Sequence, residues 1–134
     1  MIVVDTNIIS YLLTPNDLYN QLADDLFQKD SNWISPILWR HELLSVLSIY
    51  LRRNIIDTTT CKSIYQEAME TVTSRPISDF EKVFNIIENS SLSSYDCEFV
   101  ALAHENNLPL ITEDKKIIHE FPDTACTIKD YLNR

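Results

Sequence analysis

The sequence predicts an α/β protein in which a short central parallel sheet of about four to five strands lies between two layers of helices. The first observation is that short apolar runs alternate along the chain with longer segments of helical spacing. The second is that these runs are continuously apolar, which is typical of parallel strands covered on both faces. The third is the length of 134 residues, which suits a single domain over residues 1–134.

Four segments have the character of strands. The first, MIVV at residues 1–4, is apolar and runs directly into an acid. The others read NWISP, LPLIT and ACTI, at residues 32–36, 108–112 and 125–128. Because segments of helical spacing separate them, we expect parallel pairing through helical crossovers.

The remaining segments have helical spacing. Pro36 suits the first position of a long helix over residues 36–53, which Asn54 closes. A second long helix is expected over residues 57–75, capped by Asp57 or Thr58 and ended by Pro76. Serines, including Ser78, introduce two later helices. The other expected helices, in chain order, span residues 7–13, 17–28, 78–90, 93–107, 114–121 and 129–134.

The chain contains no glycine. Positions with positive φ must therefore be occupied by asparagine or aspartate, which tolerate the left-handed region best after glycine. Asn54, Asn89 and the pair Asn106–Asn107 stand where helices should end, so we expect left-handed caps there. The absence of glycine also excludes the phosphate-binding loops of P-loop and Rossmann proteins.

The composition is acidic, with 20 Asp and Glu against 11 Lys and Arg. A net charge of −9 argues against passive nucleic-acid binding, but it allows a basic partner or bound metal ions. Neither a membrane span nor a signal peptide is recognisable, so we expect a cytoplasmic protein. Cys61, Cys97 and Cys126 fit no zinc spacing and are interpreted as reduced, buried thiols.

Four acids occupy positions from which they can converge. Asp5 and Asp114 follow predicted strands, and ligands of parallel sheets bind outside the carboxyl ends of strands. Asp96 heads the apolar stripe of a helix, and Glu42 lies on a stripe of the long helix that is apolar over most of its circumference. Each acid also has a structural explanation, as a helix cap, a dipole partner or half of an ion pair.

Taken together, the four acids indicate a metal site. Carboxylates that converge in a cleft repel one another and their pKa values rise. Few basic residues are placed to neutralise them, whereas Mg²⁺ or Mn²⁺ prefers carboxylate oxygens and water. The sequence therefore predicts a bound divalent cation.

The same segments resemble a known family. VVDTN at residues 3–7, WRHELLSVL at 39–47 and SSYDCEFVALAHENNLPLITEDKKI at 93–117 are similar to a PIN domain. More narrowly, they resemble the VapC-type toxins of bacterial type II toxin–antitoxin systems. The stretch from about residue 55 to 89 carries no motif of the family.

The resemblance implies roles for individual residues. Thr6 and Thr112 correspond to hydroxyl residues that orient a carboxylate or a water, and Asn7 stands where Asn or Ser is usual. Asn107 occupies a position where the family often has glycine. The catalytic and metal-binding acids implied by the resemblance are Asp5, Glu42, Asp96 and Asp114.

The implied activity is a metal-dependent endoribonuclease that hydrolyses RNA phosphodiester bonds with one or two Mg²⁺ or Mn²⁺ ions. Arg40, Lys115 and Lys116 are candidates for a rim that guides RNA, with a solvated surface as the plain alternative. The resemblance also implies an antitoxin whose basic tail covers the acidic cleft, and we expect a homodimer. A helical pair within residues 57–90 is a candidate surface for either partner, although core packing explains its spacing equally well.

Three other functions remain as alternatives, and each would need residues that can be checked in the sequence. A PIN-like binding or interaction module without catalysis would keep the fold but lose some of the acids. A receiver-like phospho-acceptor domain needs a mid-chain strand that ends in the acceptor aspartate, whereas residues 45–75 have helical spacing. A phosphatase of the haloacid dehalogenase type needs a second aspartate where Asn7 stands.

Overall fold

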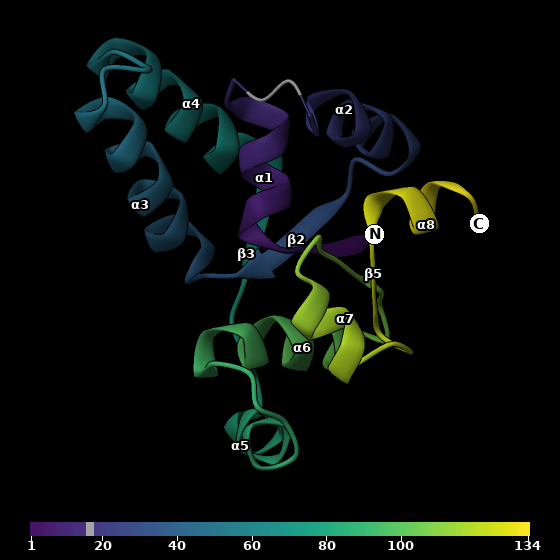
Figure 1. Ribbon diagram of the computed structural model, residues 1–134. Coiled ribbons are helices and arrows are strands. Elements are labelled where there is room, and N and C mark those ends of the chain that lie inside the picture. Colours follow the sequence, from purple (N-terminus) through teal and green to yellow (C-terminus); the bar gives the residue numbers. More distant parts are fainter. Residues whose placement is uncertain (16–17) are drawn as a thin grey trace.

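The centre of the fold is a parallel sheet with helices on both faces, as the computed structural model shows for residues 1–15 and 18–134 (Figure 1). Within this part of the chain, five strands are arranged in the order β3-β2-β1-β4-β5. Val3 of the central strand pairs with Ile34 on one side and with Leu110 on the other, both in parallel register. The predicted fold class is therefore confirmed. The strands are β1 (Ile2–Val4), β2 (Trp33–Pro36), β3 (Val72–Arg75), β4 (Leu110–Ile111) and β5 (Ala125–Cys126).

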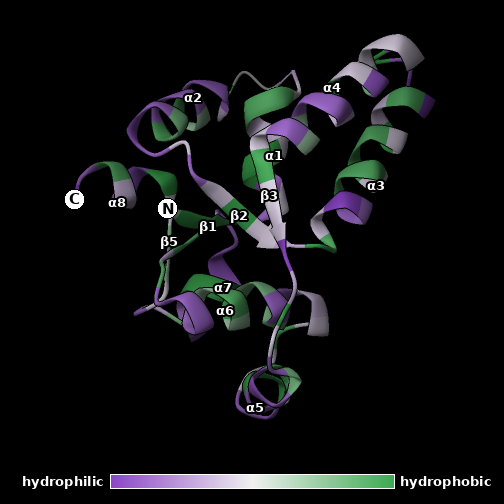
Figure 2. Cartoon of the chain, turned by 180° about the vertical axis from the view of Figure 1, so that it is seen from behind, coloured by the Kyte–Doolittle hydropathy of each residue, from purple (hydrophilic) through white to green (hydrophobic). Residues whose placement is uncertain are grey.

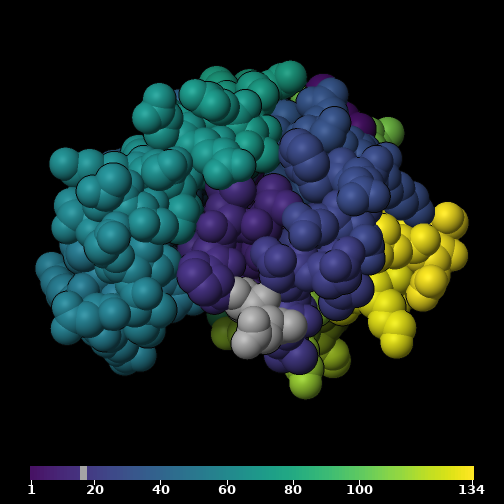
Figure 3. All heavy atoms as spheres, turned by 90° about the horizontal axis from the view of Figure 1, so that it is seen from above, coloured from purple at the N-terminus to yellow at the C-terminus, as the bar shows by residue number. Residues whose placement is uncertain are grey.

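The helices form a layer on each side of the sheet (Figure 1). One layer contains α1 (Thr6–Leu13), α2 (Asn20–Lys29), α3 (Trp39–Arg52), α4 (Thr58–Thr71) and α8 (Ile128–Leu132). The other contains α5 (Phe80–Glu88), α6 (Ser94–Asn106) and α7 (Lys115–Glu120). Seen from above, the C-terminal α8 lies beside α2 at the edge of the molecule (Figure 3). The expected start of the second helix, Asp17, lies outside the described residues.

The hydrophobic core lies on both faces of the sheet. All three residues of β1 are fully buried, and hydrophobic residues dominate β1 and α1 in Figure 2. On the opposite face the middle of α6 is buried, because this helix contacts the sheet and α5. Trp33, Trp39 and Phe99 are the largest of the fully buried side chains. This packing holds the first turns of α3 and α6 at the carboxyl edge of the sheet.

Two predicted helices have different boundaries in the structure. Pro36 is the last residue of β2 rather than the first of a helix, and α3 begins only at Trp39. The helix expected over residues 57–75 ends at Thr71, and the next four residues form the edge strand β3. Pro36 pairs with Arg75 at the end of this ladder, where a missing N–H group disturbs the sheet least.

The left-handed caps were predicted correctly at two of the positions. Asn54 and Asn107 both have φ of 57°. Asn89 has φ of −103°, and Asn106 is the last residue of α6, so neither adopts the left-handed conformation. Within residues 1–15 and 18–134, asparagine thus takes the role of glycine where α3 and α6 end.

The side-chain caps predicted for α4 and α6 are confirmed, whereas the one predicted for α5 is wrong. Asp57 and Ser93 cap α4 and α6 as expected. Asp79, not Ser78, caps α5, and its carboxylate accepts a hydrogen bond from the backbone N–H of Glu81. The Ser78 hydroxyl instead donates to the carboxylate of Glu105, at 2.9 Å.

The segment expected to form a helical pair is split between the two layers. β3 separates α4 from α5, and the two helices lie on opposite sides of the sheet (Figure 1). The cysteines are free and buried, as predicted. Within the described residues, no helix is long and apolar enough to cross a membrane.

Candidate active site

The candidate active site lies where the order of the strands reverses. The chain passes from β1 to β2 on one side, whereas β4 pairs with the other side of β1. Such a switch point opens a crevice at the carboxyl ends of the strands. Asp5 follows β1 here, and its backbone N–H donates to Ile111 O of β4 at 3.0 Å.

Asp5 is a buried carboxylate held by two hydrogen bonds. Only 8% of the residue is exposed. Its Oδ1 accepts from the backbone N–H of Thr6 at 2.7 Å, which also caps α1. Its Oδ2 accepts from the buried Thr112 hydroxyl, also at 2.7 Å. Both oxygens are therefore fixed from opposite sides, by the start of α1 and by the end of β4.

The same two threonines reach two of the other acids. The Thr6 hydroxyl donates to Glu42 Oε1 at 2.8 Å, so this one residue contacts two carboxylates. The Thr112 hydroxyl accepts from the backbone N–H of Asp114 at 3.0 Å, which fixes the turn between β4 and α7. Thr6 and Thr112 thus link three separate segments of the chain.

Asp96 and Asp114 lie at helix N-termini. Asp96 is in the first turn of α6, where Ser93 accepts a hydrogen bond from its backbone N–H. Asp114 caps α7 and accepts from the backbone N–H groups of Lys116 and Ile117. The capping role that the sequence offered as an alternative therefore exists for Asp114.

All four acids line one pocket of about 230 Å³. The structure thus brings together residues that are more than 100 positions apart in the chain. Ser45 and Val46 also line the pocket. The sequence alone indicated no functional role for them, although their spacing from Glu42 places all three on the same face of α3. The complete lining is Asp5, Thr6, Asn7, Glu42, Ser45, Val46, Asp96 and Asp114.

Burial and the charges of neighbouring carboxylates disfavour the ionised form of Asp5. The pKa of Asp5 is raised from 3.8 to about 6, and burial is the largest cause. Hydrogen bonds from Thr112 and Thr6 lower this pKa, whereas the charges of Glu42 and Asp96 raise it further. A carboxylate at the end of a buried strand thus carries an electrostatic cost that the protein alone does not remove.

The pKa values of two other acids are also raised. For Glu42 the main cause is burial, and the charges of Asp96 and Glu98 add to it. For Asp96 burial again comes first, followed by the charge of Asp114, while Lys116 acts in the opposite direction. The raised pKa values show that negative charge is concentrated here.

Basic residues do not neutralise this charge. Among the described residues, the one ion pair joins the N-terminal ammonium group to Asp30, and neither of these residues lines the pocket. Lys116 Nζ donates to Ser91 O at 2.9 Å, and Lys115 is exposed beside it. Arg40 is half-buried, does not line the pocket, and has a buried Nε without a partner in the described part of the chain.

The side chains do not form a finished metal centre. Over residues 1–15 and 18–134, no three His, Cys, Asp or Glu side chains are arranged to hold one ion. Uncompensated carboxylates repel one another, so a cation would have to draw them closer together. Mg²⁺ keeps several waters and needs only one or two carboxylates. Carboxylates and hydroxyls without a thiol or imidazole are a donor set that fits such a hard cation.

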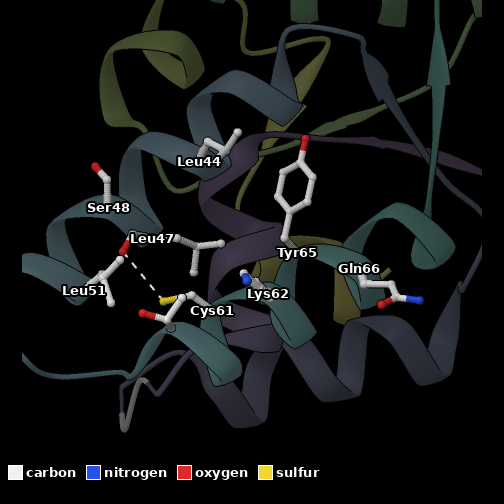
Figure 4. A pocket seen from close by; sticks show the side chains of 9 residues that line it. Leu44, Leu47, Ser48, Leu51, Cys61, Lys62, Tyr65 and Gln66 are labelled. Carbon is white, nitrogen blue, oxygen red and sulfur yellow. Dashed lines mark hydrogen bonds between the residues drawn. The ribbon is translucent and has the colours of Figure 1, made fainter.

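A different kind of pocket lies between α3 and α4. It has a volume of about 330 Å³, and mostly apolar side chains from both helices line it (Figure 4). Leu44 and Leu51 at its edge are exposed to 50% and 37%. None of the four acids lines this groove. Its lining is Leu44, Leu47, Ser48, Leu51, Thr58, Cys61, Lys62, Tyr65 and Gln66.

Comparison with known proteins identifies the fold independently. The family model of the PIN domain matches residues 2–122. PAE2754 from Pyrobaculum aerophilum has a similar structure, with a TM-score of 0.77 and 17% sequence identity, over 98% of this chain and 93% of that one. A toxin–antitoxin complex from Klebsiella pneumoniae has a TM-score of 0.71 and 18% identity, over 96% of this chain and 98% of that one. Comparison with curated proteins gave no significant match.

Proposed function

This chain belongs to the PIN domain family, and we propose that it is a metal-dependent endoribonuclease that serves as the toxin of a toxin–antitoxin pair. PIN domains are generally nucleases, which supports a hydrolase activity. The observation that carries the proposal is the convergence of four acids on one pocket without a basic residue in its lining.

The chain's own residues prepare this pocket for a cation. Asp5, Glu42, Asp96 and Asp114 would hold Mg²⁺ or Mn²⁺, directly or through water. A divalent ion held there would supply a water of lowered pKa for attack on phosphorus and would stabilise the departing oxygen. Because both oxygens of Asp5 accept hydrogen bonds, its carboxylate cannot rotate freely. The Thr6 hydroxyl orients Glu42 in the same way.

The antitoxin partner is supported by the Klebsiella pneumoniae structure, which is a toxin–antitoxin complex with the same fold. A concentrated negative charge favours a basic segment of a partner. The groove between α3 and α4 is a second feature suited to a partner, because apolar side chains of an amphipathic helix fit such a groove (Figure 4).

A homodimer is also part of the proposal. Phe80 and Phe84 on α5 are exposed to 70% and 60%, with ring centroids 6.3 Å apart. This pair offers an apolar contact that a second copy can cover. The homodimer is tested by measuring the mass in solution of the purified parent and of Phe84→Ala, which should shift toward the monomer.

The alternatives fit less well. A receiver domain has the strand order 2-1-3-4-5, whereas this sheet has the order β3-β2-β1-β4-β5. A binding module without catalysis has no need to keep four mutually repelling acids in one pocket, because their repulsion lowers stability.

The test is cleavage of RNA by the purified protein with Mg²⁺ or Mn²⁺, which EDTA should stop. Asp5→Asn and Asp96→Asn should each lower the rate at least about 100-fold, because even residues that only orient metal ligands cost 10–100-fold when mutated. Asp57→Asn is the matched control, since Asp57 is an exposed cap of α4 outside the acid pocket. Parental rates in both site variants would refute the assignment.

A further inference from the structure

A second pocket adjoins the acid pocket and shares a wall with it. Its volume is about 330 Å³. Glu42 and Ser45 line both pockets, so the two meet at the first turns of α3. Its complete lining is Leu38, His41, Glu42, Ser45 and Tyr95.

Tyr95 forms the far side of this second pocket. It lies in the first turn of α6, directly before Asp96, which lines the acid pocket. Its side chain is 61% exposed. The wall opposite Tyr95 comes from α3, in the other layer of the fold. An aromatic ring thus stands beside the acids without being needed to fill the core.

The lining determines which chemical group fits. Among the residues of this lining there is no lysine or arginine, and Glu42 is acidic. A phosphate seated here would face the carboxylate of Glu42 without a lysine or arginine to compensate its charge, which is unfavourable. A neutral planar group is free of this conflict, and it can lie flat against the ring of Tyr95 while contacting Leu38.

We propose that this second pocket binds an unpaired nucleobase of the RNA, stacked on Tyr95, beside the phosphate that the four acids engage. This inference rests on the proposed ribonuclease function. Bases and phosphates alternate along the same backbone, so a phosphate at the acids brings a neighbouring base to the adjoining pocket. Recognition of RNA commonly uses unstacked bases laid on aromatic side chains.

The proposal specifies the form of RNA rather than its sequence. Every base has a flat face, so stacking on Tyr95 tolerates all four bases. A base that is paired in a helix is not free to enter the pocket. Cleavage is therefore expected in loops and other single-stranded stretches.

The experiment first maps a cleavage site in total bacterial RNA and then uses a short fluorescein-labelled single strand containing that site. Tyr95→Ala should lower kcat/KM about 5- to 100-fold, mainly through a higher KM, because a stacked base contributes that much to binding. Tyr95→Phe keeps the ring and should stay within about twofold of the parent. Ile55→Ala removes an exposed apolar side chain that lines neither the acid pocket nor the second pocket, and it is the control.

A change in the RNA tests the contact from the other side. Abasic nucleotides are placed in turn next to the mapped site. The parent should lose cleavage at one such position, and Tyr95→Ala should show no further loss there. Equal kcat/KM for Tyr95→Ala and the parent, or an equal loss in Ile55→Ala, would overturn the base pocket. Cleavage by the parent would still support the proposed function in that case. If the parent cuts no RNA, both proposals fall.

Discussion

Replacing Asp5 by asparagine should stabilise the metal-free protein while it destroys the proposed activity. The pKa of Asp5 is raised because burial disfavours its charge, so the folded state at neutral pH contains an unfavourable carboxylate. Asparagine has the same shape without the charge. Its Oδ1 can still accept from the Thr6 N–H, and its NH₂ group can donate to the Thr112 hydroxyl, which has a free lone pair.

The size of the effect follows from the pKa. A rise from 3.8 to about 6 disfavours the charged form in the folded state by about 3 kcal/mol. Between these pH values the folded protein binds more protons than the unfolded chain, so the free energy of unfolding falls as pH rises. The cost is absent below about pH 4 and complete above about pH 7. For a chain of this length, about 3 kcal/mol corresponds to roughly 10 °C in Tm.

The assay is thermal unfolding in EDTA at pH 4 and at pH 7.5. Asp5→Asn should exceed the parent in Tm at pH 7.5 and approach it at pH 4. Asp57→Asn is the control, because hydrogen bonds from Thr60 lower the pKa of Asp57 instead of raising it. Removal of the Asp57 charge should therefore not increase the Tm. An Asp5→Asn protein that is no more stable than the parent at pH 7.5 would show that Asp5 already has a compensating partner, and the argument for a cation would fail.

Two further predictions concern the same carboxylate. At limiting Mg²⁺, the rate of RNA cleavage should rise with pH through about 6, because Asp5 must lose its proton to bind a cation. Saturating Mg²⁺ should move the midpoint of this rise to lower pH. A rate that does not change over this pH range would contradict the role of Asp5. Thr112→Val removes a hydrogen bond that lowers the Asp5 pKa, so the midpoint should move up by about 1–2 pH units, as expected for a bond to a charged group worth about 1.5–3 kcal/mol. An unchanged midpoint in Thr112→Val, measured over the same pH series, would show that this hydroxyl does not act on Asp5.

The sheet was predictable wherever its strands are continuously apolar. β1, β2, β4 and β5 all lie inside the predicted segments, because central and fully covered strands need apolar residues on both faces. The edge strand β3 lacked this signal. Only Val72 of its four residues is buried, and no glycine or proline separates it from α4. Its conformation depends on pairing with β2, which a local pattern does not encode.

The candidate site was predictable to the extent that it follows from strand ends and helical phase. Asp5 and Asp114 were identifiable because parallel strands end at one edge, and Glu42 and Asp96 because of their position on apolar helix faces. Tyr95 gave no such signal. Its pocket depends on the spacing between α3 and α6, which lie in opposite layers. α6 contacts the sheet, whereas α3 contacts α1 and α4.

Two aspartates that cap helices in this chain have pKa values shifted in opposite directions. Asp57 caps α4 on the surface, and hydrogen bonds from Thr60 lower its pKa. Asp5 also caps a helix, yet its pKa is raised, because burial outweighs the hydrogen bonds it accepts. Asparagine or serine caps a helix as well as aspartate does, so capping alone gives no reason for a charge at a buried position. The charge of Asp5 is explained if a cation binds it, because only then does its burial strengthen an interaction instead of opposing one.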